Sequence, residues 1–522
     1  MLLLLTGFNA TMYSKSSTIV TVPQPGELST QYLKPVFTDP ERLQKITALF
    51  PELETVFKRH AEKNHYPGYV YGIVVDGSLV FSGAAGNTNI ISKQPVTNNS
   101  QFHIASMTKS FTAMAILKLR DEGKLLLSDP VSKYIPELTS VKKLTTDAMP
   151  ININHLLTMT SGLPEDDAWA DRHLEDSDEK LINMIKGGLS FSRVPSEYFE
   201  YSNLGYALLG TIVSRVSGTT YQKYITRHIL NPLGMTKTYW EYSKIPANEL
   251  AQGYRWEDGL WKAETMLHTG AFGAIGGLIT SLNDFSKYVA FHMSAWPPRN
   301  EPDNGPVKRS SIREMHTPGV TKFYANAKDI NNEPCPLLLG YSFGMVILQN
   351  CKEVTTVGHS GGLPGFGSNY IIYPEYGIGI ILFSNRTYAP ASSANKEAGS
   401  LLFNKGGIKK RTLPASNILS ERFKQVVEII NTWDMELSDE ILADNFYLDH
   451  SREIRMREAK KIMASLGKVI AIEPLVPINQ LRGNFVMHGE QNDIKVFFSL
   501  TPERNPKVQT LKLTVIEKAN NH

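Results

Sequence analysis

The sequence has little cysteine and almost no net charge. Its 522 residues include only Cys335 and Cys351, which excludes a cysteine-rich zinc site and a framework of several disulfides. One disulfide between the two and a pair of separate thiols both remain open. The 54 basic and 51 acidic residues leave a formal net charge of +3. This balance predicts no nucleic-acid partner, because nucleic-acid-binding surfaces are strongly basic.

Long apolar runs are also missing. No stretch approaches the roughly 18 apolar residues that a membrane helix needs, so we expect no integral membrane span. The chain begins Met-Leu-Leu-Leu-Leu, which resembles the end of a signal peptide without its basic region. An unstructured apolar end is the alternative. The first interpretation favours a periplasmic or secreted protein, and the second leaves a cytoplasmic protein open.

Motifs for metal and nucleotide chemistry are absent as well. No His-Glu-x-x-His pattern occurs and the 13 histidines are scattered along the chain. Phosphate-loop and dinucleotide-binding signatures are not found either. The sequence therefore predicts a protein with neither a metal nor another cofactor.

The length and the order of patterns predict two folded domains behind an N-terminal tail. Strand patterns near both ends of the larger domain flank a mostly helical middle, which favours an α+β fold with an antiparallel sheet, flanking helices and a helical block. A change of character near the end of the chain predicts a small α+β domain. The boundaries are 1–40 for the tail, 41–405 for the large domain, 406–418 for a linker and 419–522 for the small domain.

Local patterns predict the elements of these domains. Apolar residues at helical spacing predict one helix over Glu41–Asn64. Asp76-Gly77 separates the apolar runs 69–75 and 79–83, which predicts a hairpin. Two more hairpins are expected, from 339–349 with 354–358 and from 369–373 with 377–384. In the small domain two or three helical segments, near 419–432, 437–445 and 453–466, precede four strands, near 468–475, 479–488, 491–499 and 508–517.

Ser106 and Lys109 are the first candidates for chemistry. They are three positions apart at the start of an apolar helical pattern, so both side chains lie on one face. A serine hydroxyl needs a base, and a lysine serves as that base only when burial or nearby positive charge lowers its pKa. The apolar surroundings favour such burial. The same spacing recurs in polar stretches, where exposed helix faces are expected, at Ser140/Lys143, Ser177/Lys180 and Ser393/Lys396.

Tyr201 and Asn203 precede the next apolar helical pattern. A tyrosine with a lowered pKa shuttles protons, and an asparagine amide holds a substrate carbonyl. A buried core tyrosine and an asparagine that caps the helix are the alternative, and the residues alone favour it. Tyr324 and Asn326 repeat the spacing, but no apolar helix follows them.

A glycine-rich segment, His359-Ser360-Gly361-Gly362, lies between strand patterns. Glycines let the backbone approach a substrate closely, and a backbone N–H from this segment would complete an oxyanion hole with that of Ser106. His359 would contact a substrate carboxylate or support proton transfer. The alternative is a turn with a structural histidine. His268-Thr269-Gly270 repeats the His-x-Gly pattern away from any hairpin, so His359 is preferred.

In this order, the three elements resemble those of the serine β-lactamase and penicillin-binding-protein family. The branch that fits contains class C β-lactamases, DD-peptidases and related esterases, whose motifs Ser-x-x-Lys, Tyr-x-Asn and His-x-Gly match 106–109, 201–203 and 359–361. The resemblance covers roughly residues 45–405. It implies a β-lactamase/transpeptidase-like fold, in which an antiparallel sheet is flanked by helices beside a helical subdomain.

The resemblance also implies a role for each residue. Ser106 would be the nucleophile, with Lys109 as its base or electrostatic support and Tyr201 as a proton shuttle. Whether Lys109 or Tyr201 takes the serine proton stays open. The substrate-binding residues would be Asn203, His359 and Gly361. The oxyanion hole would consist of the backbone N–H groups of Ser106 and Gly362.

The function implied is a serine hydrolase that forms an acyl-enzyme with small-molecule or short-peptide substrates. β-Lactamases usually have lysine at the position of His359, and a neutral imidazole attracts a carboxylate less well than an ammonium does. We therefore expect a D-amino-acid peptidase, an amidase or an esterase rather than an efficient β-lactamase. The alternative is a penicillin-binding or sensing protein that is acylated without turnover.

The C-terminal domain lies outside this resemblance. Its order of helices followed by strands is similar to that of NTF2-like domains. We expect the domain to shape substrate access or to hold together a homo-oligomer.

Overall fold

The computed structural model describes residues 32–329 and 332–518. These residues form two compact units, one over Phe37–Arg411 and one that starts at Thr412 and includes residues 32–36. The apolar N-terminal segment, with its two interpretations, lies outside the described residues. Within the described ranges, no helix is both long and apolar enough to cross a membrane.

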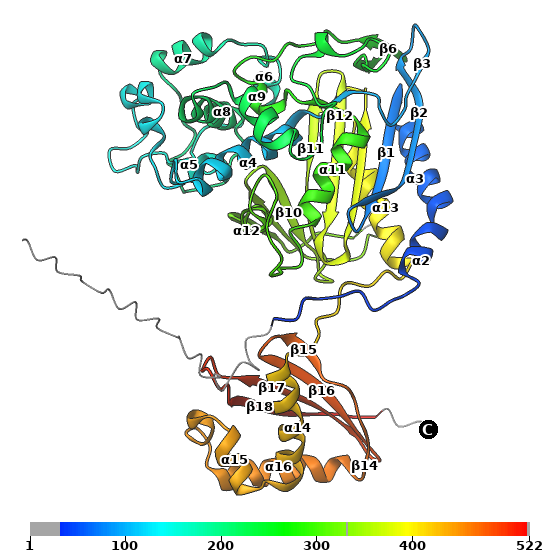
Figure 1. Cartoon of the computed structure of the whole chain (residues 1–522), viewed down its shortest axis with the longest axis vertical. Helices are drawn as coiled ribbons and strands as arrows, with labels where there is room; N and C mark the ends of the chain where they lie inside the picture. Colours follow the sequence, from blue (N-terminus) through cyan, green and yellow to red (C-terminus); the bar gives the residue numbers. More distant parts are fainter. Residues whose placement is uncertain (1–31, 330–331, 519–522) are drawn as a thin grey trace, which may run out of the picture. The chain divides into compact units, whose positions relative to one another are not determined.

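A nine-stranded antiparallel sheet organises the larger unit, in the order β3-β2-β1-β13-β12-β11-β10-β9-β8. β1 pairs with β13, which places Tyr69 opposite Ser384, so strands from the two ends of the unit lie side by side (Figure 1). The predicted α+β class with a large antiparallel sheet is confirmed. The strands are β1 Gly68–Val75, β2 Ser78–Asn89, β3 Gln94–Pro95, β8 Val320–Tyr324, β9 Leu337–Ser342, β10 Met345–Gln349, β11 Thr355–Leu363, β12 Phe366–Tyr373 and β13 Ile378–Ser384.

Alternate side chains of this sheet enter two separate cores. Tyr71 and Ile73 of β1 belong to the core that includes residues of α3 (Phe50–Lys63) and α13 (Ala391–Asn404). Val70 and Val74 point to the opposite face, into the core that contains residues of α11 (Leu282–Met293). Because successive strand residues point to opposite faces, a strand covered on both sides is apolar throughout. All eight residues of β1 are buried accordingly.

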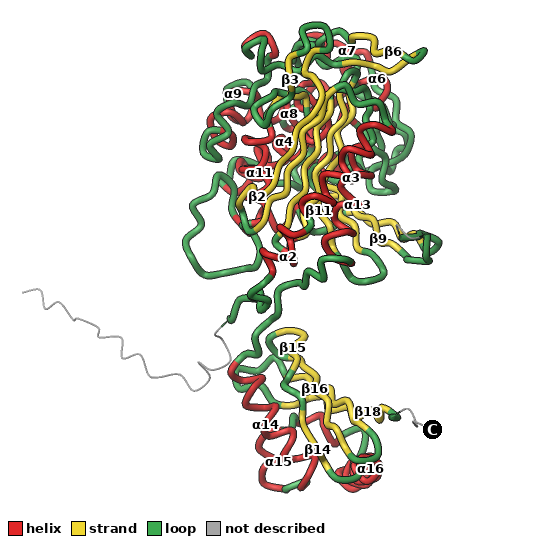
Figure 2. The backbone as a smooth tube through the Cα atoms, turned by 90° about the vertical axis from the view of Figure 1, so that its right-hand side faces the viewer, coloured by secondary structure: helices red, strands yellow, loops and turns green. Residues whose placement is uncertain are grey.

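The helical block lies on the α11 side of the sheet, opposite α3 and α13 (Figure 2). Its long helices are α4 (Thr108–Asp121) and α8 (Asn203–Ser217), whose inward residues are almost completely buried. The shorter helices of the unit are α2 Arg42–Ala48, α5 Ile153–Leu157, α6 Asp167–Ala170, α7 Asp178–Gly187, α9 Tyr221–Ile225, α10 Gly273–Gly276 and α12 Arg309–Met315. Single turns are η1 Ala105–Met107, η2 Val131–Lys133, η3 Pro136–Ser140, η4 Thr226–Leu230, η5 Tyr242–Lys244 and η6 Pro374–Tyr376. In two small sheets, β4 Phe102–His103 pairs with β7 Ile279–Thr280 and β5 Tyr254–Glu257 pairs with β6 Leu260–Ala263.

Two predicted elements are each split in the structure. The single helix expected over Glu41–Asn64 is α2 followed by α3, because Pro51 lacks an N–H group and occupies the first turn of a new helix. The strand expected over 339–349 is β9 and β10, which are joined at Phe343 and Gly344 with φ of 47° and 75°. Two residues with positive φ form the tight turn that antiparallel strands favour.

A disulfide joins Cys335 and Cys351. The two cysteines lie just before β9 and just after β10, so the bond closes the base of this hairpin. Of the two alternatives that the sequence left open, the structure therefore contains the disulfide.

The smaller unit has three helices followed by an antiparallel sheet, with a core of its own. The sheet has five strands where the sequence suggested four, because 476–479 forms an additional strand beside β16. The elements are α14 Asn417–Thr432, α15 Met435–Ile441, η7 Asp444–Tyr447, α16 Arg452–Leu466, β14 Val469–Ile472, β15 Val476–Asn479, β16 Arg482–Gly489, β17 Asp493–Leu500 and β18 Val508–Ile516.

Candidate active site

Ser106 lies in η1, the turn that leads into α4. The preceding residue, Ala105, is buried and has a φ of 49°, a conformation that is unfavourable for a residue with a Cβ atom and that bends the chain sharply. Among residues 101–110, Ser106 is partly exposed and the others are buried. The turn thus presents one hydroxyl from apolar surroundings.

Lys109 points back at this hydroxyl from the first turn of α4. Its Nζ atom lies 2.9 Å from Ser106 Oγ and donates to the carbonyl oxygen of Ile275 at 3.1 Å. The side chain is fully buried, and this desolvation lowers the pKa of the ammonium to about 8, although nearby aspartates oppose the shift. A substantial fraction of neutral amine is therefore present at mildly alkaline pH.

Tyr201 completes this group from the residue before the N-cap of α8. Lys109 Nζ lies 5.0 Å from the centre of the Tyr201 ring. Desolvation raises the pKa of the phenol well above its usual value, Asp167 adds to the rise, and a hydrogen bond with Ser106 opposes it. The sequence interpretation required a lowered pKa for Tyr201, and the shift has the opposite sign. The phenol is thus a protonated donor at neutral pH.

Asn203 is the first residue of α8 and is fully buried. The cap itself is Ser202, whose Oγ accepts from the backbone N–H of Gly205 at 3.4 Å, so the alternative role of Asn203 as the helix cap is wrong. Asn203 Nδ2 donates to Asp167 Oδ1 at 2.7 Å. Its Oδ1 is buried without a partner among the described residues, which leaves an acceptor for an external donor.

β11 carries the glycine-rich segment alongside the Ser106 turn. A Cβ atom at Gly361 would lie 2.1 Å from the carbonyl oxygen of Ile104, so only glycine fits there. Ser368 on β12 donates to the same carbonyl at 3.0 Å and fastens the hairpin to the turn. Gly362 lies against the Tyr388 ring, where an added Cβ would come within 2.7 Å of a ring carbon.

His359 is buried on β11 with its ring 6.1 Å from that of Tyr201 and 5.9 Å from that of Tyr341. Its Nδ1 donates to the carbonyl oxygen of Ser360 at 2.5 Å, and its Nε2 has no partner among the described residues. Burial, together with the charge of Lys109, lowers the pKa of the imidazole to about 4. The ring is therefore neutral at physiological pH.

The sequence interpretation missed an acidic group beside the site. Asp166 accepts from the backbone N–H groups of Asn203 and Leu204 at 2.6 and 2.9 Å, and Asp171 accepts from the Tyr388 hydroxyl at 3.0 Å. Burial raises the pKa of Asp171 to about 7. The sequence signal was the acidic run Glu165-Asp166-Asp167, with Asp171 four residues further on, which by itself looks like a solvated loop.

The look-alike motifs lie in other settings. Ser177 caps α7, His268 is exposed and paired with Glu241, and Tyr324 is exposed on β8. Within the described ranges, no cluster of three or more histidine, cysteine, aspartate or glutamate side chains is placed to hold a metal ion. The structure thus brings together Ser106, Lys109 and Tyr201 with the β11 segment and separates them from the other candidates.

Comparison with known proteins identifies relatives of this chain. The chain is 29% identical over 346 residues to Protein flp of Staphylococcus aureus (strain COL), which covers 64% of this chain and 62% of flp. It is 26% identical over 352 residues to Penicillin-binding protein 4* of Bacillus subtilis (strain 168), which covers 64% of this chain and 71% of that protein. The chain therefore spans about three fifths of the flp proteins that it matches.

A solved structure and a family profile extend the comparison. The octameric penicillin-binding protein homologue from Pyrococcus abyssi superposes with a TM-score of 0.58, covering 90% of this chain and 98% of that one at 22% identity, which shows a shared fold. Residues 53–403 match the profile of the Beta-lactamase family. This match spans more than half of the chain and contains the complete Ser106 site. The chain therefore belongs to the beta-lactamase family.

Proposed function

We propose that this protein is a serine hydrolase that forms an acyl-enzyme on Ser106, with substrate preferences like those of the peptidases and esterases in the class C branch. The observation that carries the proposal is the 2.9 Å contact between Lys109 Nζ and Ser106 Oγ in a desolvated setting. No carboxylate among the described residues pairs with Lys109, and a lysine with a pKa of about 8 is suited to accept a proton from a serine.

The reaction follows from this geometry. Neutral Lys109 takes the hydroxyl proton as Ser106 Oγ attacks the substrate carbonyl, and the backbone N–H groups of Ser106 and Gly362 stabilise the oxyanion. Protonated Tyr201 donates to the leaving group and recovers a proton through Lys109. Water then cleaves the ester bond of the acyl-enzyme by the reverse transfer. In this scheme Lys109 is the base in acylation, because the raised pKa of Tyr201 makes its phenolate costly.

Neutral His359 supports substrates that do not depend on a carboxylate at this edge of the site. With a pKa of about 4, the imidazole carries no charge at pH 7, whereas a lysine here would offer a point charge. D-amino-acid peptides, amides and esters are thus favoured over β-lactams. The unpartnered Asn203 Oδ1 and His359 Nε2 are the acceptors available to bind substrate N–H or O–H groups.

A second candidate function is a protein that is acylated by penicillin without turnover. The observation in its favour is the similarity to Penicillin-binding protein 4*. The smaller unit would serve either function as an assembly module, since the neighbour with a shared fold is described as octameric. We retain the proposed boundaries, with a linker over 406–418 and an NTF2-like domain over 419–522, as part of this proposal.

Replacing the nucleophile tests the function. Ser106→Ala should abolish hydrolysis of a p-nitrophenyl ester and labelling by a fluorophosphonate, with a loss of at least about 10³-fold. Ser393→Ala, which alters an exposed serine in another Ser-x-x-Lys pair, should leave both activities intact. Full activity in Ser106→Ala would refute the assignment.

Substrate class is tested by a panel of D-amino-acid peptides, p-nitrophenyl esters and a chromogenic cephalosporin. Multiple turnovers of a peptide or ester, with slow cephalosporin hydrolysis, support the proposed preference. One equivalent of stable acylation by the cephalosporin and no turnover of any substrate would favour the second function instead.

A further inference from the structure

The larger unit has a cavity outside the Ser106 site with a strongly basic lining. It measures about 790 Å³ and lies between the end of α8, the segment α9–η4 and residues 238–244, a size within the range of small-molecule sites. Among the described residues that line it, Glu241 alone is acidic. Its basic lining residues are Lys124, Lys223, Arg227, His228 and Lys244.

Three of these cations lack a counter-charge. In the part of the chain that the structure describes, no ion pair involves Lys223, Arg227 or Lys244. The carboxylate of Glu241 is taken by His268 at 2.9 Å, and Lys124 is already paired with Glu122 at 2.8 Å. The concave surface therefore has a positive potential that its own acids do not neutralise.

The pKa of His228 is lowered at this wall of the cavity, partly by the same positive charges. Desolvation lowers the pKa of its imidazole most, and the positive charges of Lys118 and Arg227 lower it further, while Glu122 opposes the shift. A cation is thus disfavoured at this wall of the cavity, and an anion is favoured.

A buried phenol adds a hydrogen-bonding group to the lining. Tyr224 is 3% exposed, and its hydroxyl has no partner among the described residues. A buried hydroxyl without a partner is costly, and a bound ligand can supply the missing one. The Trp240 indole N–H donates to Thr226 Oγ1 at 3.2 Å, which fixes the ring of Trp240 as an apolar wall of the same cavity.

The backbone here is irregular as well. η4 is a single π-helical turn, in which the N–H of Asn231 reaches back five residues to the carbonyl of Thr226 at 2.9 Å. Such turns are rare and occur frequently at functional sites. This one carries Arg227 and His228, two of the basic lining residues.

We propose that this cavity binds a small phosphate-bearing molecule. Three unpaired cations line one concavity beside an unpartnered buried phenol, and several separate donors suit a tetrahedral, multiply charged anion better than a planar carboxylate that one arginine fork would satisfy. The Trp240 wall favours an organic phosphate with a ring over inorganic phosphate. The site is independent of the proposed hydrolase activity.

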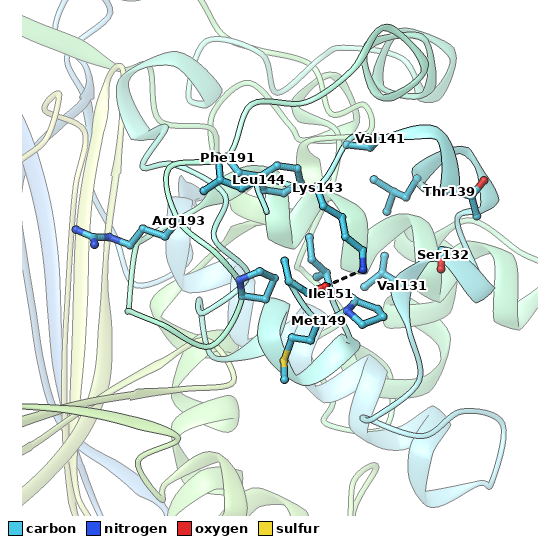
Figure 3. Close-up of a pocket in the computed structure, with 14 residues that line it drawn as sticks. Val131, Ser132, Thr139, Val141, Lys143, Leu144, Met149, Ile151, Phe191 and Arg193 are labelled. Carbon is cyan, nitrogen blue, oxygen red and sulfur yellow. Dashed lines mark hydrogen bonds between the residues drawn. The ribbon is translucent and has the colours of Figure 1, made fainter. Parts of the chain in front are cut away.

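Another cavity of the larger unit differs from this one in its lining residues. It measures about 280 Å³ and is lined mainly by apolar side chains (Figure 3). Its Lys143 ammonium is held by the carbonyl of Ala148 at 2.7 Å, and Arg193 lies near Glu197 and Glu200. Among the described residues that line it, Lys143 alone is a cation without an acidic partner, so the same inference does not apply there.

Calorimetric titration of the full-length protein with phenyl phosphate and with inorganic phosphate at low ionic strength tests the proposal. We expect saturable one-to-one binding, with phenyl phosphate tighter than inorganic phosphate. The double variant Lys223→Gln/Arg227→Gln should weaken binding about tenfold or more. Lys58→Gln/Lys63→Gln on α3 removes the same charge from an exposed face and should not change it.

A second variant tests the proposal even if the double variant fails to fold. Tyr224→Phe removes only the unpartnered hydroxyl, so the Tm should not fall while phosphate binding weakens. Equal affinity in the charge variant and its control would overturn the proposal, as would the absence of saturable binding to wild type. Equal affinity for phenyl phosphate and inorganic phosphate would show that the site recognises the phosphate group and not the ring.

Discussion

The ammonium of Lys109 has hydrogen-bond partners that are all uncharged. Its partners are the hydroxyl of Ser106 and a backbone carbonyl, and the aspartates that favour its charge act only at longer range. Burial therefore outweighs attraction, and the pKa falls from 10.5 to about 8. A hydrogen-bonded carboxylate in this place would have kept the lysine charged and useless as a base.

The first prediction concerns the pH dependence of acylation. The rate of fluorophosphonate labelling at Ser106 should rise with pH and level off above about 8, because the neutral amine of Lys109 is the reactive form. Lys109→Arg should remove this profile and slow labelling about 10²-fold or more, since a guanidinium stays protonated. A wild-type rate that is flat between pH 6 and 9 would contradict the assignment of Lys109 as the base.

The identity of these residues could be predicted from the sequence, but their protonation could not. The spacing of Ser106 and Lys109 and their apolar neighbours indicated the pair, because i and i+3 share a helix face. The direction of the Tyr201 pKa shift could not be predicted from the sequence, since it depends on how deeply a loop residue is desolvated. The contact of Asp171 was missed because its partner, Tyr388, is 217 positions away in the sequence.

At the scale of elements, the site depends on how closely β11 approaches η1. Gly361→Ala should separate them, because the added Cβ would lie 2.1 Å from a backbone oxygen that cannot move independently. We expect a loss of about 2 kcal/mol or more in stability and most of the esterase activity, measured by thermal unfolding and initial rates. Gly187→Ala at the end of α7 meets no atom within 4 Å and has no positive φ, so it should change neither. Normal activity in Gly361→Ala would show that this approach is not required.

A second contact joins the α6 region to the third motif. The Tyr388 hydroxyl donates to Asp171, and the Tyr388 ring lies against Gly362, whose N–H we propose for the oxyanion hole. Tyr388→Phe should lower kcat/KM up to about tenfold through loss of this hydrogen bond, without changing the Tm by more than a few degrees. An unchanged kcat/KM would show that the contact does not position Gly362.

The same contact predicts a pH effect that a structural role alone would not give. Asp171 has a pKa of about 7, raised by burial and opposed by Lys109, and Asp166, Asp167, Tyr388 and Arg172 complete its charged surroundings. As Asp171 ionises above pH 7, it becomes the stronger acceptor for Tyr388. Asp171→Asn should keep the contact but remove the limb of the kcat/KM profile near pH 7. A profile identical to that of wild type would refute this coupling.

Elements with strong local signals were predicted, and the errors have local causes. The β12–β13 hairpin formed as expected around Pro374, whose fixed φ suits the turn. β15 was missed because it is a four-residue strand that contains Pro477 and pairs along one side only. The nine-strand order could not be predicted, since pairing between β1 and β13 depends on contacts distant in sequence.

On the scale of the whole molecule, the two units have separate cores and different histidine environments. The larger unit buries His103 and His359, each with a pKa lowered to about 4, and His316, with a pKa of about 3, all mainly by desolvation. In the smaller unit His488 is paired with Asp493 and Glu473, which raise its pKa. The two units should therefore respond to acid with opposite signs.

The sign follows from proton uptake. A histidine with a folded-state pKa near 4 binds its proton later than the unfolded chain does, so the larger unit loses stability as the pH falls from about 6.5 to 4, by about 2 kcal/mol per such histidine at pH 5. Because the folded-state pKa of Asp171 is raised, protonation of Asp171 stabilises the larger unit over part of this range, and this contribution offsets the loss from about one histidine. For His488 the folded pKa is raised, so its contribution is present in acid and is lost as the pH rises through that pKa.

Scanning calorimetry of the full chain at pH 8 and pH 5 tests this difference. Two transitions are expected, because a unit with its own core unfolds cooperatively by itself. The transition of the larger unit, identified by its greater enthalpy, should move to lower temperature at pH 5, while that of the smaller unit should stay or rise slightly. His488→Gln should abolish the slight rise in the transition temperature of the smaller unit at pH 5 and leave the transition temperature of the larger unit unchanged. If both transitions moved down together, the buried neutral histidines would not be what governs the acid response of this protein.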